Sequence, residues 1–153
     1  MSAALHLAGS ADAAALLPMV AAYHAEGGIA STEDHRAAAL QPLLDGSPLG
    51  CAYLIGPRRA PIGYIVITFG WSLEFGGMEG FVDEFFVRRG VRGRGIGSEA
   101  LGALIPELEA NGLRALHLEA SAEEPQLQRL YARAGFELRD GYHLMTRVGR
   151  GHG

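Results

Sequence analysis

Apolar residues recur along this chain with two different periods, and each period predicts one kind of element. The segments Asp12–Tyr23, Ser31–Leu44 and Ser98–Ala110 carry apolar residues on one helical face, and a fourth helix is predicted between Pro125 and Gly135. Apolar and aromatic runs between turn residues predict strands at Ala3–Leu7, Cys51–Ile55, Ile62–Trp71, Gly80–Arg88, Leu113–Glu119 and Tyr142–Val148, with a short one at Phe136–Leu138.

Three of the predicted helices contain an internal proline. Proline lacks an amide hydrogen and crowds the preceding turn, so it usually kinks or ends a helix. Pro18 therefore predicts a kinked or split first helix, while Pro42 and Pro106 weaken the prediction of the last turns of the next two.

The resulting order is β-α-α-β-β-β-α-β-α-β. Short polar or glycine-rich turns join the three central strands, which favours antiparallel neighbours. The pattern predicts an α/β fold in which a single domain, residues 1–148, has a mixed, mostly antiparallel central sheet flanked by helices. Residues 149–153 are expected to form a loose C-terminal tail.

Composition narrows the function classes. Of 153 residues, 48% are hydrophobic and 20% are charged, which is enough apolar surface for a core, and the net charge of −4 disfavours a nucleic-acid partner. No apolar run reaches the roughly 18 residues that a membrane span needs, and the N-terminus lacks a signal-peptide pattern. We therefore expect a soluble, cytoplasmic protein with no membrane partner.

Cysteine and histidine suggest neither a disulfide nor a metal site. The single cysteine, Cys51, opens an apolar run and is better interpreted as a strand residue than as a catalytic thiol. The six histidines show no metal-ligand spacing, so structural or surface roles are expected for them.

The most informative segment is the glycine-rich loop that follows the strand ending near Arg88. It contains Gly90, Gly93, Gly95 and Gly97, interleaved with Arg92 and Arg94, and it leads into a helix. A helix N-terminus presents unpaired amides and a partial positive charge, and glycines let a ligand approach the backbone closely. The loop is therefore a candidate anion site.

The spacing Arg92-x-x-Gly95-x-Gly97 resembles the pyrophosphate-binding motif of the GNAT N-acetyltransferase superfamily. Phe85-x-Val87 looks like that family's bulged fourth strand, which receives the pantetheine arm, and Leu130-Tyr131 with Gly135-Phe136 resembles its helix-to-strand element. The likeness runs from about Gly63 to Val148 and is looser to the diamine acetyltransferase branch. It implies a GNAT-like fold, acetyl-CoA as cosubstrate, no metal, and cofactor contacts from Phe86, Val87, Arg92, Gly93, Arg94, Gly95, Ile96, Gly97 and Ser98.

Two positions depart from the family pattern. Arg89 stands where the family often has proline, which changes the entry into the loop. Glu124 stands where it often has asparagine, so an asparagine contact to pantetheine is not expected here.

Two alternative roles for the loop agree less well with the sequence. Gly95-x-Gly97-x-x-Ala100 with Glu119 fits a dinucleotide fingerprint, but the preceding strand carries Asp83 and a second carboxylate, and only 56 residues follow Gly97. A purely structural glycine turn would not call for the neighbouring arginines.

Three side chains are candidates for the chemistry. Asp83 or Glu84 could deprotonate an amine, the alternative being a structural ion pair with a loop arginine. The resemblance makes Tyr131 the donor to the leaving thiolate, the alternative being a buried helix aromatic, and makes the amide of Val87 the oxyanion donor.

The function predicted from these residues is N-acetyl transfer. The chain would move acetyl from acetyl-CoA to a primary amine by direct attack in a ternary complex, and the alternative is a non-catalytic acyl-CoA-binding or regulatory domain. The acceptor is a small-molecule or peptide amine. His24 and Glu26 would border its site, and acidic residues at the strand hairpin, Glu74 and Glu79 beside Trp71, would suit a cation. Exposed strand edges would allow a homodimer.

Overall fold

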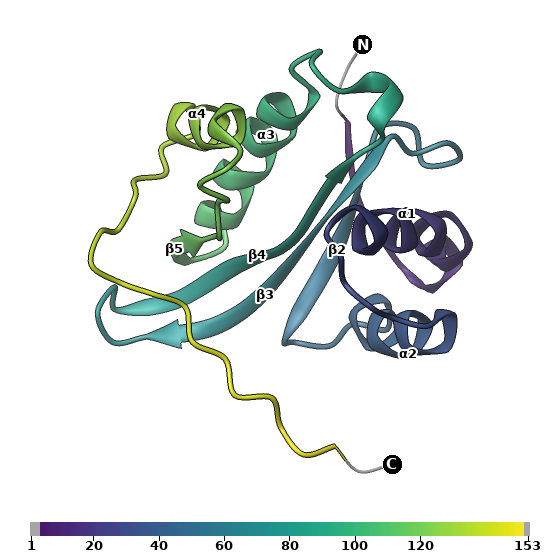
Figure 1. Cartoon of the computed structure of the whole chain (residues 1–153), viewed down its shortest axis with the longest axis horizontal. Coiled ribbons are helices and arrows are strands. Elements are labelled where there is room, and N and C mark those ends of the chain that lie inside the picture. Colours follow the sequence, from purple (N-terminus) through teal and green to yellow (C-terminus); the bar gives the residue numbers. More distant parts are fainter. Residues whose placement is uncertain (1–3, 152–153) are drawn as a thin grey trace.

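The computed structural model describes residues 4–151, and over that range a single sheet carries helices on both faces (Figure 1). The elements in chain order are β1 (Leu5–Leu7), α1 (Ala13–Glu26), α2 (Glu33–Leu44), β2 (Gly50–Ile55), β3 (Gly63–Ser72), β4 (Gly77–Val87), α3 (Ile96–Ala110), β5 (Leu113–His117) and α4 (Pro125–Arg133), with single 3-10 turns at Ser10–Asp12 and Arg89–Val91. The predicted single α/β domain is confirmed.

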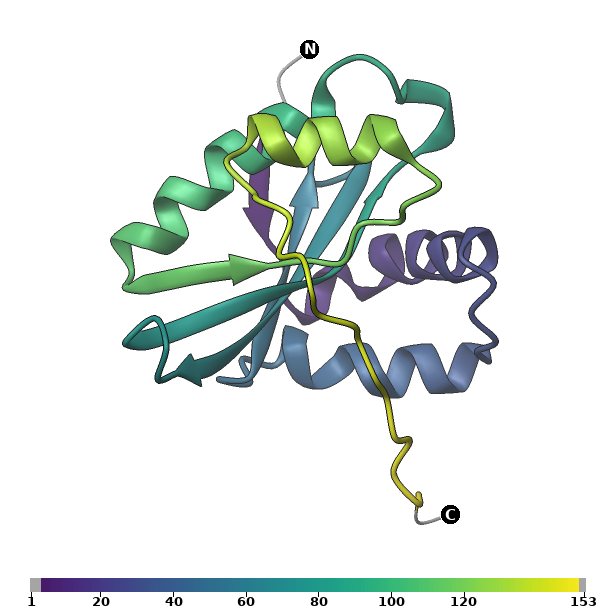
Figure 2. The same cartoon turned by 60° about the vertical axis from the view of Figure 1, so that its left-hand side comes forward.

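The sheet has five strands in the order β1-β2-β3-β4-β5. The first three neighbouring pairs are antiparallel and β4 pairs with β5 in parallel, so the predicted mixed, mostly antiparallel sheet is also confirmed. β4 pairs with β3 along its whole length, but it pairs with β5 only from Met78 to Phe81. The two strands therefore separate beyond Phe81, and Figure 2 shows β4 running on past the end of β5.

A β-bulge lies at the point where β4 leaves β5. Val66 on β3 faces Glu84, whereas the next residue, Ile67, faces Val82, so Asp83 is an extra residue without a partner on β3. Paired residues share one face of a sheet. The bulge therefore places Glu84 on the face covered by α1 and α2, while Val82 packs on the opposite face.

Two separate cores hold the sheet between its helices. On one face, Leu101, Leu104 and Leu108 of α3 pack with Tyr131 of α4 against the strands. On the other face, the side chains come from α1, α2 and β2 to β4; they include Leu16, Met19, Val20, Leu40, Leu44, Leu54, Tyr64 and Phe86.

The internal prolines break none of the helices. α1, α2 and α3 continue through Pro18, Pro42 and Pro106 to their ends at Glu26, Leu44 and Ala110, so α1 is not split and the last turns of α2 and α3 form. Each proline removes one amide donor, and the buried leucines and methionine on these helices contribute far more than one such bond.

The predicted strands at Phe136–Leu138 and Tyr142–Val148 do not form. Residues 137–151 lie outside helices and strands, and their side chains are exposed. The apolar alternation marked a segment that is able to form a strand, but a strand also needs a neighbour, and the sheet ends at β5. Of the predicted tail, residues 149–151 are exposed and irregular, while 152–153, like the predicted strand start at Ala3, fall outside the described residues.

None of the helices between residues 4 and 151 is long and apolar enough to cross a bilayer.

Candidate active site

The opening between β4 and β5 is bordered by an unpaired backbone edge. Arg88 donates its amide to the carbonyl of Ile62 at 2.8 Å, on the β3 side. Amides alternate between the two edges of a strand. The amides of Phe85 and Val87 therefore point away from β3, into the opening.

Helix α3 begins at one end of this opening. Gly93 and Gly95 have φ angles of 80° and 77°, which side chains other than glycine rarely adopt, and Gly95 is the N-cap. Glu99 donates its amide to the carbonyl of Gly95 at 3.0 Å. The three preceding amides, at Ile96, Gly97 and Ser98, are the first of the helix and have no carbonyl one turn earlier to bond.

Gly97 is glycine because the helix approaches β4 closely. A Cβ atom there would lie 3.2 Å from Leu130 on α4 and 3.3 Å from the ring of Phe85. The helix start, α4 and β4 are thus brought together at one place.

Arg92 is occupied by partners within the protein. Its Nη2 lies 2.8 Å from Oε1 of Glu26, its Nε donates to the carbonyl of Val87 at 2.6 Å, and its guanidinium lies 5.4 Å from the centre of the Phe86 ring. Arg94 is exposed and makes no hydrogen bond or ion pair with residues 4–151. The side chain of Arg94 is therefore available to a ligand, whereas that of Arg92 already connects the loop to α1.

Phe86 is the predicted site residue that the fold does not bring to the opening. Its side chain is buried in the α1 and α2 core against Tyr64 and Tyr23. Because of the bulge, it is Phe85 and not Phe86 whose side chain points toward α3 and α4. The ring of Phe85 lies 6.4 Å from that of Tyr131.

Glu84 is held in a buried network. Its carboxylate lies 2.6 Å from Nε2 of His24 and accepts the hydroxyl proton of Tyr64 at 2.7 Å. Nδ1 of His24 lies 2.7 Å from Oγ of Ser31, which also accepts from Arg36. Glu84 thus has a structural partner, but that partner is a histidine of α1 and not the predicted loop arginine.

Asp83, the bulge residue, is exposed and has no hydrogen bond or ion pair within residues 4–151. The surrounding protein still removes part of its hydration, which raises the pKa of its carboxyl; the charge of Glu84 raises it further, and His24 opposes both. A carboxylate that keeps solvent access while its pKa is raised is suited to proton transfer.

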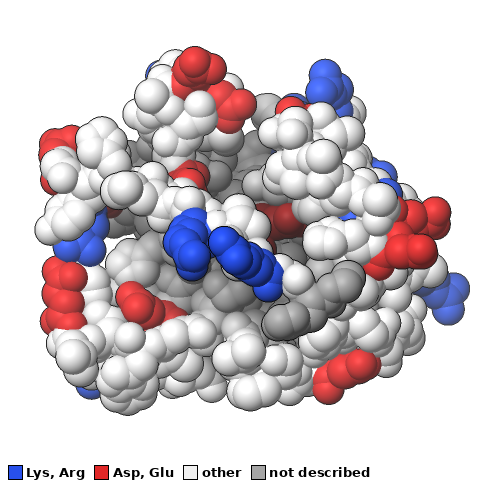
Figure 3. Space-filling view, turned by 60° about the horizontal axis from the view of Figure 1, so that its bottom comes forward, with Lys and Arg blue, Asp and Glu red and all other residues white. Residues whose placement is uncertain are grey.

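Further carboxylates surround the same opening. Burial first, and then the charges of Glu84, Asp83, Glu119 and Glu124, raise the pKa of Tyr23. Figure 3 shows acidic side chains set back in a hollow on one face of the molecule, with basic side chains at the surface in front of them. Four carboxylates therefore act together on the phenol of Tyr23, near the end of α1.

Tyr131 is buried at the inner side of the opening and is 9% exposed. Its hydroxyl forms no hydrogen bond with the described side chains or backbone, and no polar atom among them is fully enclosed without a partner. Burial, followed by the neighbours Tyr23 and Glu124, raises its pKa to about 12. The hydroxyl is thus protonated at physiological pH and free to donate.

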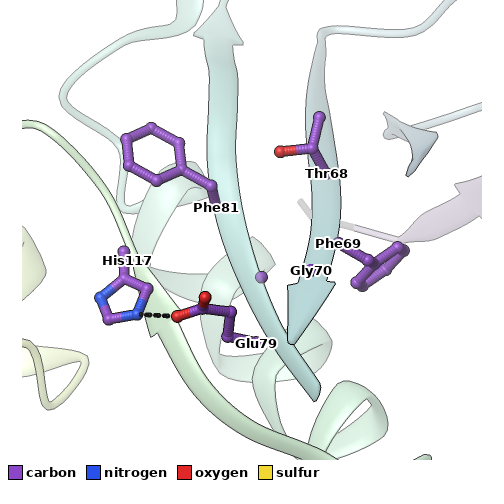
Figure 4. Close-up of a pocket in the computed structure, with 7 residues that line it drawn as sticks. Thr68, Phe69, Gly70, Glu79, Phe81 and His117 are labelled. Carbon is purple, nitrogen blue, oxygen red and sulfur yellow. Dashed lines mark hydrogen bonds and ion pairs between the residues drawn. The ribbon is translucent and has the colours of Figure 1, made fainter. Parts of the chain in front are cut away.

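A pocket of about 250 Å³ lies beside the last β4–β5 pair (Figure 4). His117 and Glu79, 2.9 Å apart, line it with Phe81 and the β3 residues around Gly70. Of the other predicted hairpin residues, Trp71 is 73% exposed and Glu74 pairs with Arg139. Glu79 is thus the acidic hairpin residue that reaches a pocket.

Among residues 4–151, no three or more His, Cys, Asp or Glu side chains are arranged to hold a metal ion.

Known proteins resemble this chain in sequence and in fold. The model of the Acetyltransferase (GNAT) family matches residues 18–136. Integron cassette protein HFX_CASS3, from the mobile metagenome of Cole Harbour Salt Marsh, is 36% identical, with a TM-score of 0.80 over 94% of this chain and 89% of that chain. A candidate acetyltransferase from Arthrobacter sp. FB24 is 28% identical, with a TM-score of 0.76 over 97% of this chain and 95% of that chain.

A ribosomal-protein-alanine N-acetyltransferase from Brucella melitensis biovar Abortus 2308 has the same fold at 21% identity, with a TM-score of 0.75 over 97% of this chain and 100% of that chain. A comparison with curated protein sequences finds no match.

Proposed function

This chain belongs to the acetyltransferase (GNAT) family, and from that membership we propose that it transfers acetyl from acetyl-CoA to a primary amine. One observation carries the proposal. The opening between β4 and β5 has unpaired helix amides at one end and the exposed carboxyl of Asp83 at the other. These are the groups needed to hold a nucleotide-linked thioester and to take a proton from the attacking amine.

The described residues fit acetyl-CoA. The amides of Ile96, Gly97 and Ser98 would bind the pyrophosphate, with Arg94 adding charge from solvent. The free edge of β4 would pair with the amide groups of the pantetheine arm as a neighbouring strand does. The thioester carbonyl would then accept from the amide of Val87, which would stabilise the oxygen as charge develops on it.

Proton transfer would be divided between two side chains. An alkylammonium acceptor must lose a proton before its nitrogen can attack, and we assign this step to Asp83, directly or through water. Nitrogen then attacks the thioester carbon and the C–S bond breaks in the ternary complex. The departing sulfur carries the negative charge, which the hydroxyl of Tyr131 would stabilise.

The acceptor is proposed to be a cationic amine. The charges of Asp83, Glu119 and Glu124 all raise the pKa of Tyr23 near the end of α1, and Glu79 reaches the neighbouring pocket. Such a field would attract and orient an ammonium group. A small diamine or an amine on a basic peptide would fit this chemistry better than an acidic amino acid.

Thiol release from acetyl-CoA across a panel of amines tests the proposal, with calorimetric binding of acetyl-CoA measured beside it. Turnover is expected with amines that carry a second positive charge, and matched amines carrying a carboxylate serve as controls. Binding of acetyl-CoA without turnover on any amine would instead indicate a non-catalytic acyl-CoA-binding domain. If acetyl-CoA did not bind at all, the assignment of the opening between β4 and β5 as its site would be wrong.

A further inference from the structure

The guanidinium of Arg92 lies on the α1 side of β4, although this residue belongs to the loop that leads into α3. Its Nη2 contacts both carboxylate oxygens of Glu26, at 2.8 Å and 3.1 Å. It also lies over the ring of Phe86, which is buried in the core under α1 and α2. The charge that this loop would offer to a pyrophosphate is therefore held on the face of the sheet opposite α3.

A third contact places Arg92 at the exposed edge of β4. Its Nε donates to the carbonyl of Val87 at 2.6 Å. The amide and the carbonyl of one strand residue point to the same edge, so this carbonyl faces the opening, as the amide of Val87 does. Arg92 thus occupies a backbone group with which the pantetheine arm would pair, and the arm and Arg92 compete for this edge.

Glu26 is the last residue of α1, where a carboxylate does not stabilise a helix. The carbonyls at the end of a helix carry a partial negative charge, which repels an acidic side chain. Two arginines offset this repulsion, Arg92 at 2.8 Å and Arg89 at 3.7 Å. Glu26 is therefore better explained by the cations that it binds than by the stability of its own helix.

The pair between Glu26 and Arg92 is able to exchange partners. Arg92 is 39% exposed and Glu26 is 31% exposed, and ion pairs at such positions contribute little to stability. A single nitrogen meets both carboxylate oxygens, whereas a phosphate can bind a guanidinium through two nitrogens in parallel. Arg92 lies only three residues before Gly95, the N-cap of α3, so a pyrophosphate at that helix start is within its reach.

Glu26 also lies close to the carboxylates of β4. Tyr23 is one turn earlier on the same face of α1. Burial, and then the charges of Glu84 and Asp83, raise the pKa of Tyr23. A cation attracted to these carboxylates would therefore come near Glu26, and it would find Glu26 already paired unless Arg92 had left.

We propose that acetyl-CoA takes Arg92 from Glu26, and that Glu26 then binds the second positive charge of a cationic acceptor. The first step moves the guanidinium from the end of α1 to the pyrophosphate at the start of α3. The second step uses the carboxylate that is left behind at the negative end of a helix. Glu26 thus opposes the binding of one substrate and favours that of the other. This inference rests on the proposed acetyl transfer.

Calorimetry of acetyl-CoA binding tests the first step in a double-mutant cycle. Glu26→Gln should bind acetyl-CoA about two- to fivefold more tightly than the wild type, because it no longer retains Arg92 in an exposed ion pair. Arg92→Gln should bind at least about tenfold more weakly, because a charged hydrogen bond to phosphate is lost. In the Arg92→Gln chain, adding Glu26→Gln should have no effect, since no guanidinium is left to release.

Arg89 supplies the matched control, because it lies near the same carboxylate and is 78% exposed. In the Arg89→Gln chain, Glu26→Gln should tighten acetyl-CoA binding as it does in the wild type. Equal tightening in the Arg92→Gln chain would mean that Glu26 repels the cofactor directly, and the exchange would be wrong. Unchanged or weaker binding by Glu26→Gln alone would also overturn it.

Steady-state kinetics test the second step with a straight-chain diamine and the monoamine of equal length. Glu26→Gln should raise the KM of the diamine at least about threefold while it lowers the KM of acetyl-CoA, and it should affect the monoamine less. A general loss of structure would not move the two KM values in opposite directions. Equal effects on diamine and monoamine would contradict the second step. If the wild type bound no acetyl-CoA, the proposed function would fail as well, whereas binding without the expected coupling would overturn the exchange alone.

Discussion

Asp83 and Glu84 are adjacent carboxylates with opposite surroundings. Glu84 accepts from Tyr64 and lies against His24, so its oxygens are already used. Asp83 is exposed, has no such partner within residues 4–151, and has a raised pKa. The residue that the fold leaves unsatisfied is the better candidate for proton transfer, and the residue beside it is better understood as a support that fixes α1 against the sheet.

Replacing Asp83 should therefore separate activity from stability. We expect Asp83→Asn to lower kcat by about 10²–10⁴-fold, the usual contribution of a positioned base. Because its pKa is raised in the fold, the folded state binds more protons than the unfolded chain between the two pKa values, and stability falls as pH rises through that window. At neutral pH the carboxylate thus opposes folding, so the variant should unfold no earlier than the wild type.

Kinetics and thermal unfolding of Asp83→Asn check this, with Glu84→Gln as the matched control. The control should lower the melting temperature, because it weakens the bonds to His24 and Tyr64. If Asp83→Asn kept wild-type kcat with chemistry rate-limiting, the base role would be excluded.

Tyr131 should act as a hydrogen-bond donor and not as a full acid. Its pKa of about 12 lies about 3.5 units above that of an ordinary thiol, so complete proton transfer to a thiolate would be uphill by about 5 kcal/mol. A hydrogen bond that strengthens as charge builds on sulfur avoids this cost. We expect Tyr131→Phe to lower kcat at least about tenfold.

The same variant should leave the melting temperature and acetyl-CoA affinity nearly unchanged, since the hydroxyl bonds to no described residue and the ring is kept. Stopped-flow thiol release, calorimetry and thermal unfolding give the three values. A large loss of stability would show that the hydroxyl has a structural role.

At the scale of elements, the proposed acetyl-CoA site depends on the start of α3. Ser98 is the third residue of that helix, a position at which an acidic side chain stabilises the helix by about 0.3–1 kcal/mol. The same charge would repel a pyrophosphate bound at the first amides. We expect Ser98→Asp to raise the Kd for acetyl-CoA by at least about tenfold, or about 1.4 kcal/mol, without lowering the melting temperature.

Isothermal calorimetry on Ser98→Asp and on the neutral control Ser98→Ala measures this effect. The control should bind acetyl-CoA within a few-fold of the wild type. Equal affinity in Ser98→Asp and wild type would show that the pyrophosphate does not lie at this helix start.

Local sequence patterns predicted the helices and strands, whereas the surroundings of the site residues depend on contacts between residues far apart in the sequence. The period of apolar residues and the glycine loop were enough to predict the four helices and the strands up to β5, with α3 beginning two residues earlier than the predicted Ser98. The side chains around Glu84 come from positions 60 and 20 residues away, and no local pattern announces them. The bulge left one trace, since two adjacent carboxylates interrupt an otherwise apolar strand. The C-terminal segment was predicted as a strand because the pattern cannot say whether a neighbour is within reach.

At the scale of the whole molecule, the site lies between the two hydrophobic cores, which pack on opposite faces of the sheet. α3 and α4 pack on one face and α1 and α2 on the other, and the opening divides β4 from β5. A ligand in that opening would contact the α3 side, the exposed edge of β4 and the end of α1 together. Binding should therefore stabilise the molecule as a unit.

Acetyl-CoA at about 100 times its Kd should raise the free energy of unfolding by about 2.7 kcal/mol, by mass action on the folded state. Urea unfolding with and without acetyl-CoA measures the difference, and amide exchange should show protection at 85–98 and not at β1. An unchanged midpoint at saturating acetyl-CoA would contradict binding to the folded state.

The bulge at Asp83 inserts one residue into β4 and so shifts the alternation of its later side chains between the two faces of the sheet. Before it, one parity of residue numbers faces α1 and α2; after it, the opposite parity does. Deleting Asp83 would restore a regular strand in which Glu84 follows Val82 directly, so every later side chain would keep its face and only the carboxyl at the opening would be lost. A regular strand that kept all of its residues would instead turn Glu84 and Phe86 toward α3, and Phe85 and Val87 toward α1. Substitutions along this strand are local changes, whereas loss of the bulge without loss of a residue would exchange the side chains on its two faces.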